Sequence, residues 1–131
     1  MASFNEGIRA FEAAEALEQA RRVKINSDGK VEYADADAVG DGVVLYAVDS
    51  GDSVAVRMFN TSGTFEIAAA GAFSSAAAVY AAADGKVQAL PEAAGTYLQV
   101  GRAVEAATAD GDIVEFYPAP DAIGASATVS E

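Results

Sequence analysis

The chain has 131 residues and contains no Cys, His or Trp. This length fits one domain and can bury a core without disulfides or metal. Without Cys and His, the chain has no disulfides, thiolate ligands, Ser-His-Asp triad or Cys-His pair. A formal charge of −12 disfavours binding to phosphate backbones and anionic lipid, so we expect no nucleic-acid or membrane partner.

The apolar content of 52% consists largely of Ala, with Val the commonest larger residue. The longest Ala-rich run, residues 67–83, is interrupted by Gly71, Ser74 and Ser75, so we expect no transmembrane helix. The first residues lack a basic segment followed by an apolar one. We therefore expect no secretion signal and a protein made in a cytoplasm.

Residues 1–9 carry Phe4 and Ile8 among polar neighbours, which predicts an extended arm. An extended arm can add to another protein's sheet through main-chain hydrogen bonds. The candidate partner-binding residues are Phe4, Ile8, Arg9 and Phe11. A frayed terminus is the alternative.

Residues 11–22 predict a short strand through Phe11 followed by an irregular connection. A helix over residues 12–21 is the alternative, because Ala, Glu, Leu and Gln favour helix.

Asp28-Gly29 then predicts a hairpin turn, since Gly adopts positive φ at no steric cost. Before this turn, Val23 and Ile25 alternate with Arg22 and Lys24, which predicts one wet face. Further alternation predicts strands over 44–48, 54–58 and 114–116.

Several short motifs recur in the same order along the chain, which predicts two related halves, 10–60 and 64–118. We expect the halves to pack about a pseudo-twofold axis within a single β domain over residues 10–118. The matched segments are 11–12 with 65–66, 28–31 with 84–87, 44–48 with 100–104 and 51–54 with 111–114. Chance similarity in a chain rich in Ala, Gly and Asp is the alternative.

The predicted fold is all-β, a compact barrel or sandwich of about eight to ten short strands. Residues 119–131 form a low-complexity segment, which predicts a mobile C-terminal tail.

The sequence assigns no catalytic, cofactor-binding or metal-binding residue. Neither Asp-Gly-Lys segment has the Walker A spacing. Ser27 and Lys30 match a Ser-x-x-Lys pair, but this pair spans the predicted turn. The carboxylates of Asp35, Asp37 and Asp41 lack the bidentate Glu of an EF-hand and predict a solvated acidic loop.

The order of several segments resembles the tailed-phage capsid cement (head decoration) family, over residues 8–118. These segments are Phe-Glu-Ala-Ala-Glu-Ala-Leu at 11–17, Arg-Arg-Val-Lys-Ile at 21–25, Ala-Val-Tyr-Ala-Ala-Ala-Asp-Gly-Lys-Val at 78–87 and Gly-Arg-Ala-Val-Glu-Ala at 101–106. The family is sometimes labelled a RecA/RadA-type phage recombinase, which the missing Walker A motif does not support.

The resemblance implies a non-enzymatic structural protein on the outer surface of a phage capsid. It implies binding between subunits of the major capsid protein, as a homotrimer, and stabilisation of the expanded head. It brings no catalytic residues and no cofactor. The alternatives are a carbohydrate- or surface-binding β module displayed on the virion, and a small enzyme that uses carboxylates.

Overall fold

The computed structural model describes residues 7–61, 63–118 and 126–129. Within these residues the regular elements are β-strands and one short 3-10 helix, so the predicted all-β class is confirmed. The elements are β1 (Ile8–Glu12), β2 (Arg22–Ile25), β3 (Val31–Tyr33), β4 (Gly42–Val44), β5 (Ser53–Met58), β6 (Phe65–Ala68), β7 (Ala78–Ala81), η1 (Ala83–Gly85), β8 (Val87–Gln88), β9 (Gly95–Ala103), β10 (Ile113–Tyr117) and β11 (Ser126–Val129).

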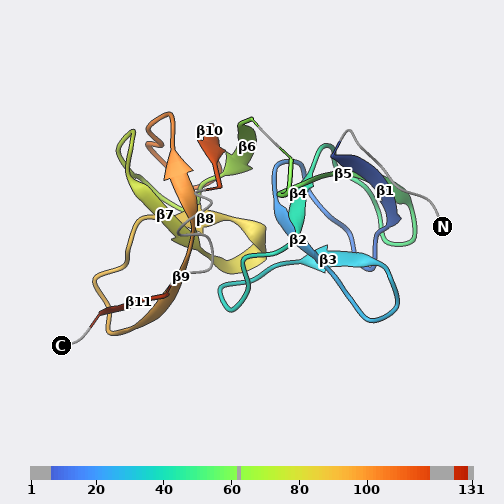
Figure 1. The fold of residues 1–131 in the computed structure, drawn as a ribbon, viewed down its shortest axis with the longest axis horizontal. Coiled ribbons are helices and arrows are strands. Elements are labelled where there is room, and N and C mark those ends of the chain that lie inside the picture. Colours follow the sequence, from blue (N-terminus) through green and yellow to red (C-terminus); the bar gives the residue numbers. More distant parts are fainter. Residues whose placement is uncertain (1–6, 62, 119–125, 130–131) are drawn as a thin grey trace.

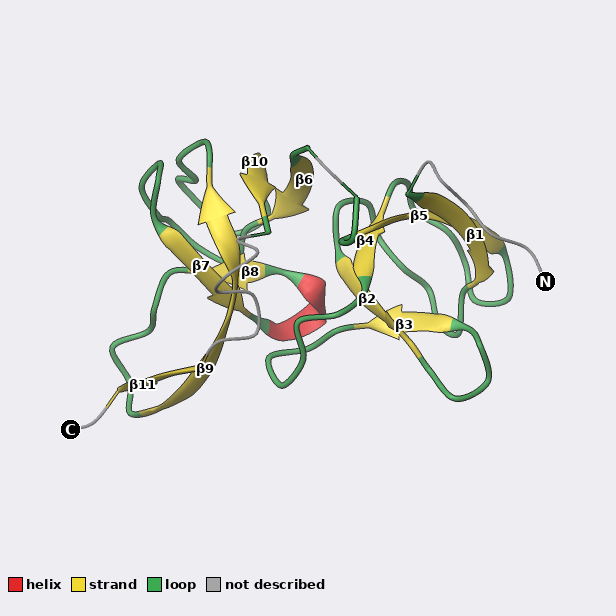
Figure 2. Ribbon diagram, in the orientation of Figure 1, coloured by secondary structure: helices red, strands yellow, loops and turns green. Residues whose placement is uncertain are grey.

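The strands form two antiparallel sheets, which occupy two lobes along the long axis of the molecule (Figure 1). The first lobe holds the order β1-β5-β4-β2-β3, and the second holds β6-β10-β9-β7-β8 with β11 added to β9. The second order is the first with every strand number raised by five. Neither sheet closes into a barrel among the described strands, and loops make up much of each lobe (Figure 2).

The same backbone hydrogen bonds recur in both lobes and define which positions are equivalent. Leu17 N donates to Val48 O, as Phe73 N donates to Ala107 O, and Ala20 N donates to Val44 O. The bond equivalent to Ala20 N–Val44 O in the second lobe runs from Ala76 N to Ala103 O. In the same way, the bond from Gly51 N to Ala13 O has its equivalent from Gly111 N to Ala69 O. The recurrence is a property of the fold; descent of both halves from one ancestral unit stays a prediction.

These bonds correct the register of the sequence alignment. The structural equivalent of Val44 is Ala103 and not Val100, and the equivalent of Phe11 is Ile67 and not Phe65. Relative to the first lobe, the second lobe therefore has no extra residues before β7, the equivalent of β2. Its extra residues lie mainly between β8 and the end of β9.

The segment after β1 is irregular, so the helical alternative over residues 12–21 is wrong. Ala13 and Leu17 instead form isolated bridges to Val31 and Val48. The hairpin prediction is confirmed: β2 and β3 pair, and Gly29 adopts a φ of 77° in the turn.

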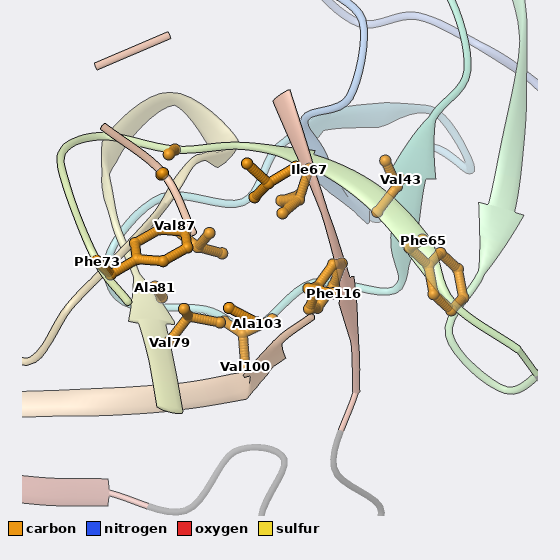
Figure 3. Close-up of a cluster of buried hydrophobic side chains, with 13 residues drawn as sticks. Val43, Phe65, Ile67, Phe73, Val79, Ala81, Val87, Val100, Ala103 and Phe116 are labelled. Atoms are coloured by element: carbon orange, nitrogen blue, oxygen red, sulfur yellow. The ribbon is translucent and has the colours of Figure 1, made fainter. Parts of the chain in front are cut away.

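Each lobe buries its own apolar cluster. The first lobe packs Leu17, Val23 and Val44 around Phe11. The second packs Ile67, Phe73 and Phe116, and it also includes Val43 of the first lobe (Figure 3). Val43 of β4 thus extends the second cluster into the first lobe. Folding of residues 10–118 as a single domain stays a prediction.

Both predicted terminal segments need correction. The sheet begins at Ile8, so residues 8 and 9 belong to β1 and not to the arm. Residues 126–129 form β11, which pairs with the start of β9 between Ser126–Leu98 and Val129–Gly95, so this part of the tail is ordered in a strand. Composition misses β11 because Ser, Ala and Thr carry little hydrophobic signal.

The lobes meet through different surfaces. The first lobe contributes β2 and β4, whereas the second contributes η1 and β6, which correspond to the first lobe's hairpin turn and β1. A twofold axis would join identical surfaces, so the predicted pseudo-twofold relation is wrong. The contact is heterologous, head to tail.

Candidate functional site

The guanidinium of Arg22 lies at the centre of the contact between the lobes, which we call the seam. Its Nη1 donates to Ala38 O at 2.6 Å and to Val39 O at 3.0 Å in the first lobe. Its Nη2 donates to Ala82 O at 2.7 Å and to Lys86 O at 2.8 Å in the second lobe. One side chain thereby connects carbonyl groups from both lobes.

Arg22 is fully buried, with a relative exposure of 0%. Burial lowers the pKa of Arg22 to about 10, while the charge of Asp35 acts in the opposite direction. The guanidinium is therefore charged at neutral pH, and carbonyl dipoles replace its hydration.

The position of Arg22 contradicts the wet face predicted from the alternation of residues 22–25. Arg22 and Val23 are both buried, whereas Ile25 is 40% exposed. Alternation along a strand predicts a wet face only when one face of the sheet is covered. Here the second lobe packs against the predicted wet face, so Arg22 is buried. A signal was present in the repeat, since Arg21-Arg22 stand where the second half has Ala77-Ala78.

Further hydrogen bonds cross the seam, among them one from Arg57 Nη1 to Thr64 O. Arg21 Nη1 donates to Asp84 O at 3.0 Å, and Asp84 N donates to the Asp35 carboxylate at 2.9 Å. Ala68 N in β6 donates to Ala20 O at 2.8 Å. Ala20, whose carbonyl accepts this bond from β6, has a left-handed backbone conformation with a φ of 61°.

An open cleft of about 440 Å³ lies beside the seam. Arg57 extends from β5 over the Phe65 ring, 4.3 Å from its centre. The backbone N–H of Glu115 donates to Glu105 at 2.8 Å, and the Thr64 hydroxyl donates to Glu115. The lining residues are Gln19, Ala20, Val43, Val44, Leu45, Arg57, Thr64, Phe65, Glu66, Glu105 and Glu115.

The chemistry of this cleft is limited by its residue types. The carboxylates of Glu105 and Glu115 accept hydrogen bonds from neighbouring groups, and the chain has no His or Cys to act as a base or a soft ligand. Among the described residues, no three acidic side chains gather in an arrangement suited to a metal ion.

The acidic loops are exposed, as predicted, but several of their carboxylates cap backbone groups. Asp41 accepts from Ile25 N at 2.9 Å, as Asp35 does from Asp84 N. Asp112 accepts from Thr108 N, the Thr108 hydroxyl and Ala109 N at 2.8–3.2 Å. These bonds lower the pKa of Asp112.

The candidate partner-binding residues fall in three different settings. Phe4 lies outside the described residues. Ile8 is 45% exposed, and it and Arg9 lie exposed on β1, the last strand of the first sheet. Phe11 is 9% exposed and belongs to the first lobe's core. Partner binding by these residues stays a prediction.

No helix within the described part of the chain has the length and hydropathy that a membrane crossing requires.

Comparisons with known proteins agree with this geometry. The family model described as "Phage cement protein" matches residues 11–117. The structure resembles the crystal structure of the head fiber gp8.5 N base in bacteriophage phi29, with a TM-score of 0.69 and 19% sequence identity. The match covers 86% of this chain and 92% of that one. No curated protein sequence matches. The chain belongs to the phage cement protein family.

Proposed function

We propose that this protein binds the outer surface of a phage capsid, between subunits of the major capsid protein, as a homotrimer, and stabilises the expanded head. The observation that carries the proposal is the cement-family match across residues 11–117. The fold resemblance to the base of a phage head fiber supports it. The proposed role is structural and involves no catalysis.

The physical argument rests on linkage. A ligand that binds only the expanded arrangement of subunits stabilises that arrangement by mass action, and many copies on one particle add their contributions. A formal charge of −12 keeps individual copies soluble and repels DNA outside the shell.

The test adds purified full-length protein to expanded particles that lack it and to unexpanded procapsids of the same phage. We expect saturable binding to the expanded particles only, a higher temperature of particle disruption after binding, and density between capsid subunits in a cryo-EM map. Equal binding to both particles would refute the dependence on expansion. Saturable binding with no change in disruption temperature would refute the stabilising role.

A further inference from the structure

The seam joins two different surfaces, and each lobe carries an equivalent of the surface that the other lobe uses. These two equivalent surfaces lie at opposite ends of the molecule and, in the part of the chain that the structure describes, make no contact with each other. The first lobe uses β2 and β4 in the seam, and their equivalents in the second lobe, β7 and β9, lie at the far end (Figure 1). The second lobe uses β6, and its equivalent β1 lies at the opposite end, near the N-terminus. Among the described strands, β1 pairs with β5 alone.

Burial follows this arrangement position by position. Ala20 and Ala68, which bond across the seam, are each 2% exposed. The equivalent of Ala20 at the far end is Ala76, which is exposed. The equivalent of Ala68 is Glu12 of β1, which is exposed too. The positions that close the seam are thus open at both ends.

The backbone at the far end already has the seam conformation. Ala76 has a φ of 67°, close to the 61° of Ala20. A left-handed residue other than Gly is strained, and such strain marks positions where the surroundings require it. At Ala20 the carbonyl bonds β6, and at Ala76 it accepts the Arg102 side chain at 3.2 Å.

The side chains at the two ends are complementary. In the seam, the Arg57 guanidinium lies over the Phe65 ring. The equivalent pair joins Tyr117 at one end with Arg9 at the other, so cation and ring exchange places. In a single copy the Arg9 guanidinium lies 5.2 Å from the centre of the Phe11 ring. Beside them, the equivalent of the Ala20–Ala68 contact brings Arg102, bonded to Ala76 O, close to the carboxylate of Glu12, which in a single copy pairs with Lys30 at 3.0 Å.

We propose that β1 of one copy docks on the Ala76–Arg102–Tyr117 surface of the next copy and repeats the seam between molecules. The contact is heterologous, so it closes into a ring or continues into a filament. The number of copies rests on the homotrimer of the proposed function: three chains would place six lobes in one ring.

The test uses sedimentation of the full chain and two variants that each destroy one end. Ile8→Glu places a charge on β1, and Ala76→Glu places one opposite Glu12. Ala16→Glu and Ala72→Glu are matched controls, because they place the same charge at equivalent exposed positions, one in each lobe, outside both ends. We expect the wild type and both controls to form trimers, and each end variant alone to be monomeric at 13.3 kDa.

Mixing the two end variants gives the decisive result. Each retains the end that the other has lost, so we expect a 1:1 dimer of twice the chain mass and nothing larger. Thermal unfolding of each variant shows whether it is folded. A wild type that stays monomeric at millimolar concentration would overturn the proposal, as would end variants that still form trimers or a mixture that forms no dimer. Saturable binding of a wild-type monomer to expanded capsids would show that this inference and the homotrimer fail, while the proposed capsid binding stands.

Discussion

Replacement of Arg22 by Met tests whether the buried guanidinium holds the two lobes together. Met has a similar length and no charge, so the four carbonyl groups of Ala38, Val39, Ala82 and Lys86 lose a charged donor. At about 1.5 kcal/mol for each charge-assisted bond, this loss costs about 6 kcal/mol.

Removal of a buried charge returns part of this cost. Burial lowers the pKa of Arg22 to about 10, and at about 1.4 kcal/mol per pKa unit this lowering corresponds to about 3 kcal/mol of burial cost. We therefore expect Arg22→Met to lower the free energy of unfolding by about 3 kcal/mol. For a chain of this length the melting temperature would fall by about 10 °C.

The assay is thermal and urea unfolding followed by circular dichroism, with amide hydrogen exchange at Asp84 as a local readout of the seam. Lys24→Met is the matched control, because Lys24 is the neighbouring strand residue and its ion pair with Glu32, at 3.7 Å, is partly exposed. We expect the control to change the free energy of unfolding by less than about 0.5 kcal/mol. A variant Arg22→Met as stable as the wild type would refute the reasoning, since burial of the charge would then cost as much as its hydrogen bonds contribute.

Three further changes test other parts of the structure. A Cβ on Gly42 would lie 2.4 Å from a β5 carbonyl, so we expect Gly42→Ala to destabilise the fold by about 1–3 kcal/mol in urea unfolding, whereas Gly71→Ala, with open space around it, should not destabilise it. The lowered pKa of Asp112 means that its stabilising contribution is present above the ordinary value of 3.8 and is lost as the pH falls through the lowered pKa. The stability difference between wild type and Asp112→Asn should therefore shrink on acidification, and a difference that is constant from pH 7 to 2 would contradict this. Deletion of residues 1–6 should weaken attachment to capsids in a co-sedimentation assay and leave the melting temperature unchanged, and unchanged occupancy would count against an arm.

Much of the strand pattern follows from the sequence because it depends on local chemistry. Asp28-Gly29 and the alternation around it identify the first hairpin, and the repeated Asp84-Gly85 marks its counterpart. The alignment of the halves fails at Phe11 and Val44 because an identical residue lies two or three positions before the true equivalent, and only hydrogen bonds between strands distinguish the two registers.

The candidate site was less accessible to sequence analysis, since it depends on how one lobe packs against the other. Arg22 lies on a strand that predicts a wet face, and the residues that surround it come from loops up to 64 positions away. No local sequence pattern predicts the contact between Arg22 and the carbonyl groups of the second lobe. The edge position of β1 is equally non-local, so Ile8 and Arg9 could be nominated from composition, but their place in the sheet could not be derived.

The contrast between repeated and divergent positions has a physical reason. Several interior positions keep the same residue in both lobes, as Val23 and Val31 match Val79 and Val87. Surfaces that meet head to tail need complementary chemistry and not identical chemistry.

The seam and the two ends of the molecule differ in the side chains that they carry. The seam encloses a charged Arg22 among carbonyl groups, which are costly to expose singly, so the lobes stay together. The ends carry exposed Glu12, Arg102 and Tyr117. Exposed polar side chains remain hydrated in a single copy, and their pairing contributes little free energy. A seam that buries a charged side chain suits a permanent contact within one chain. Ends with exposed polar side chains suit copies that must stay soluble until they assemble.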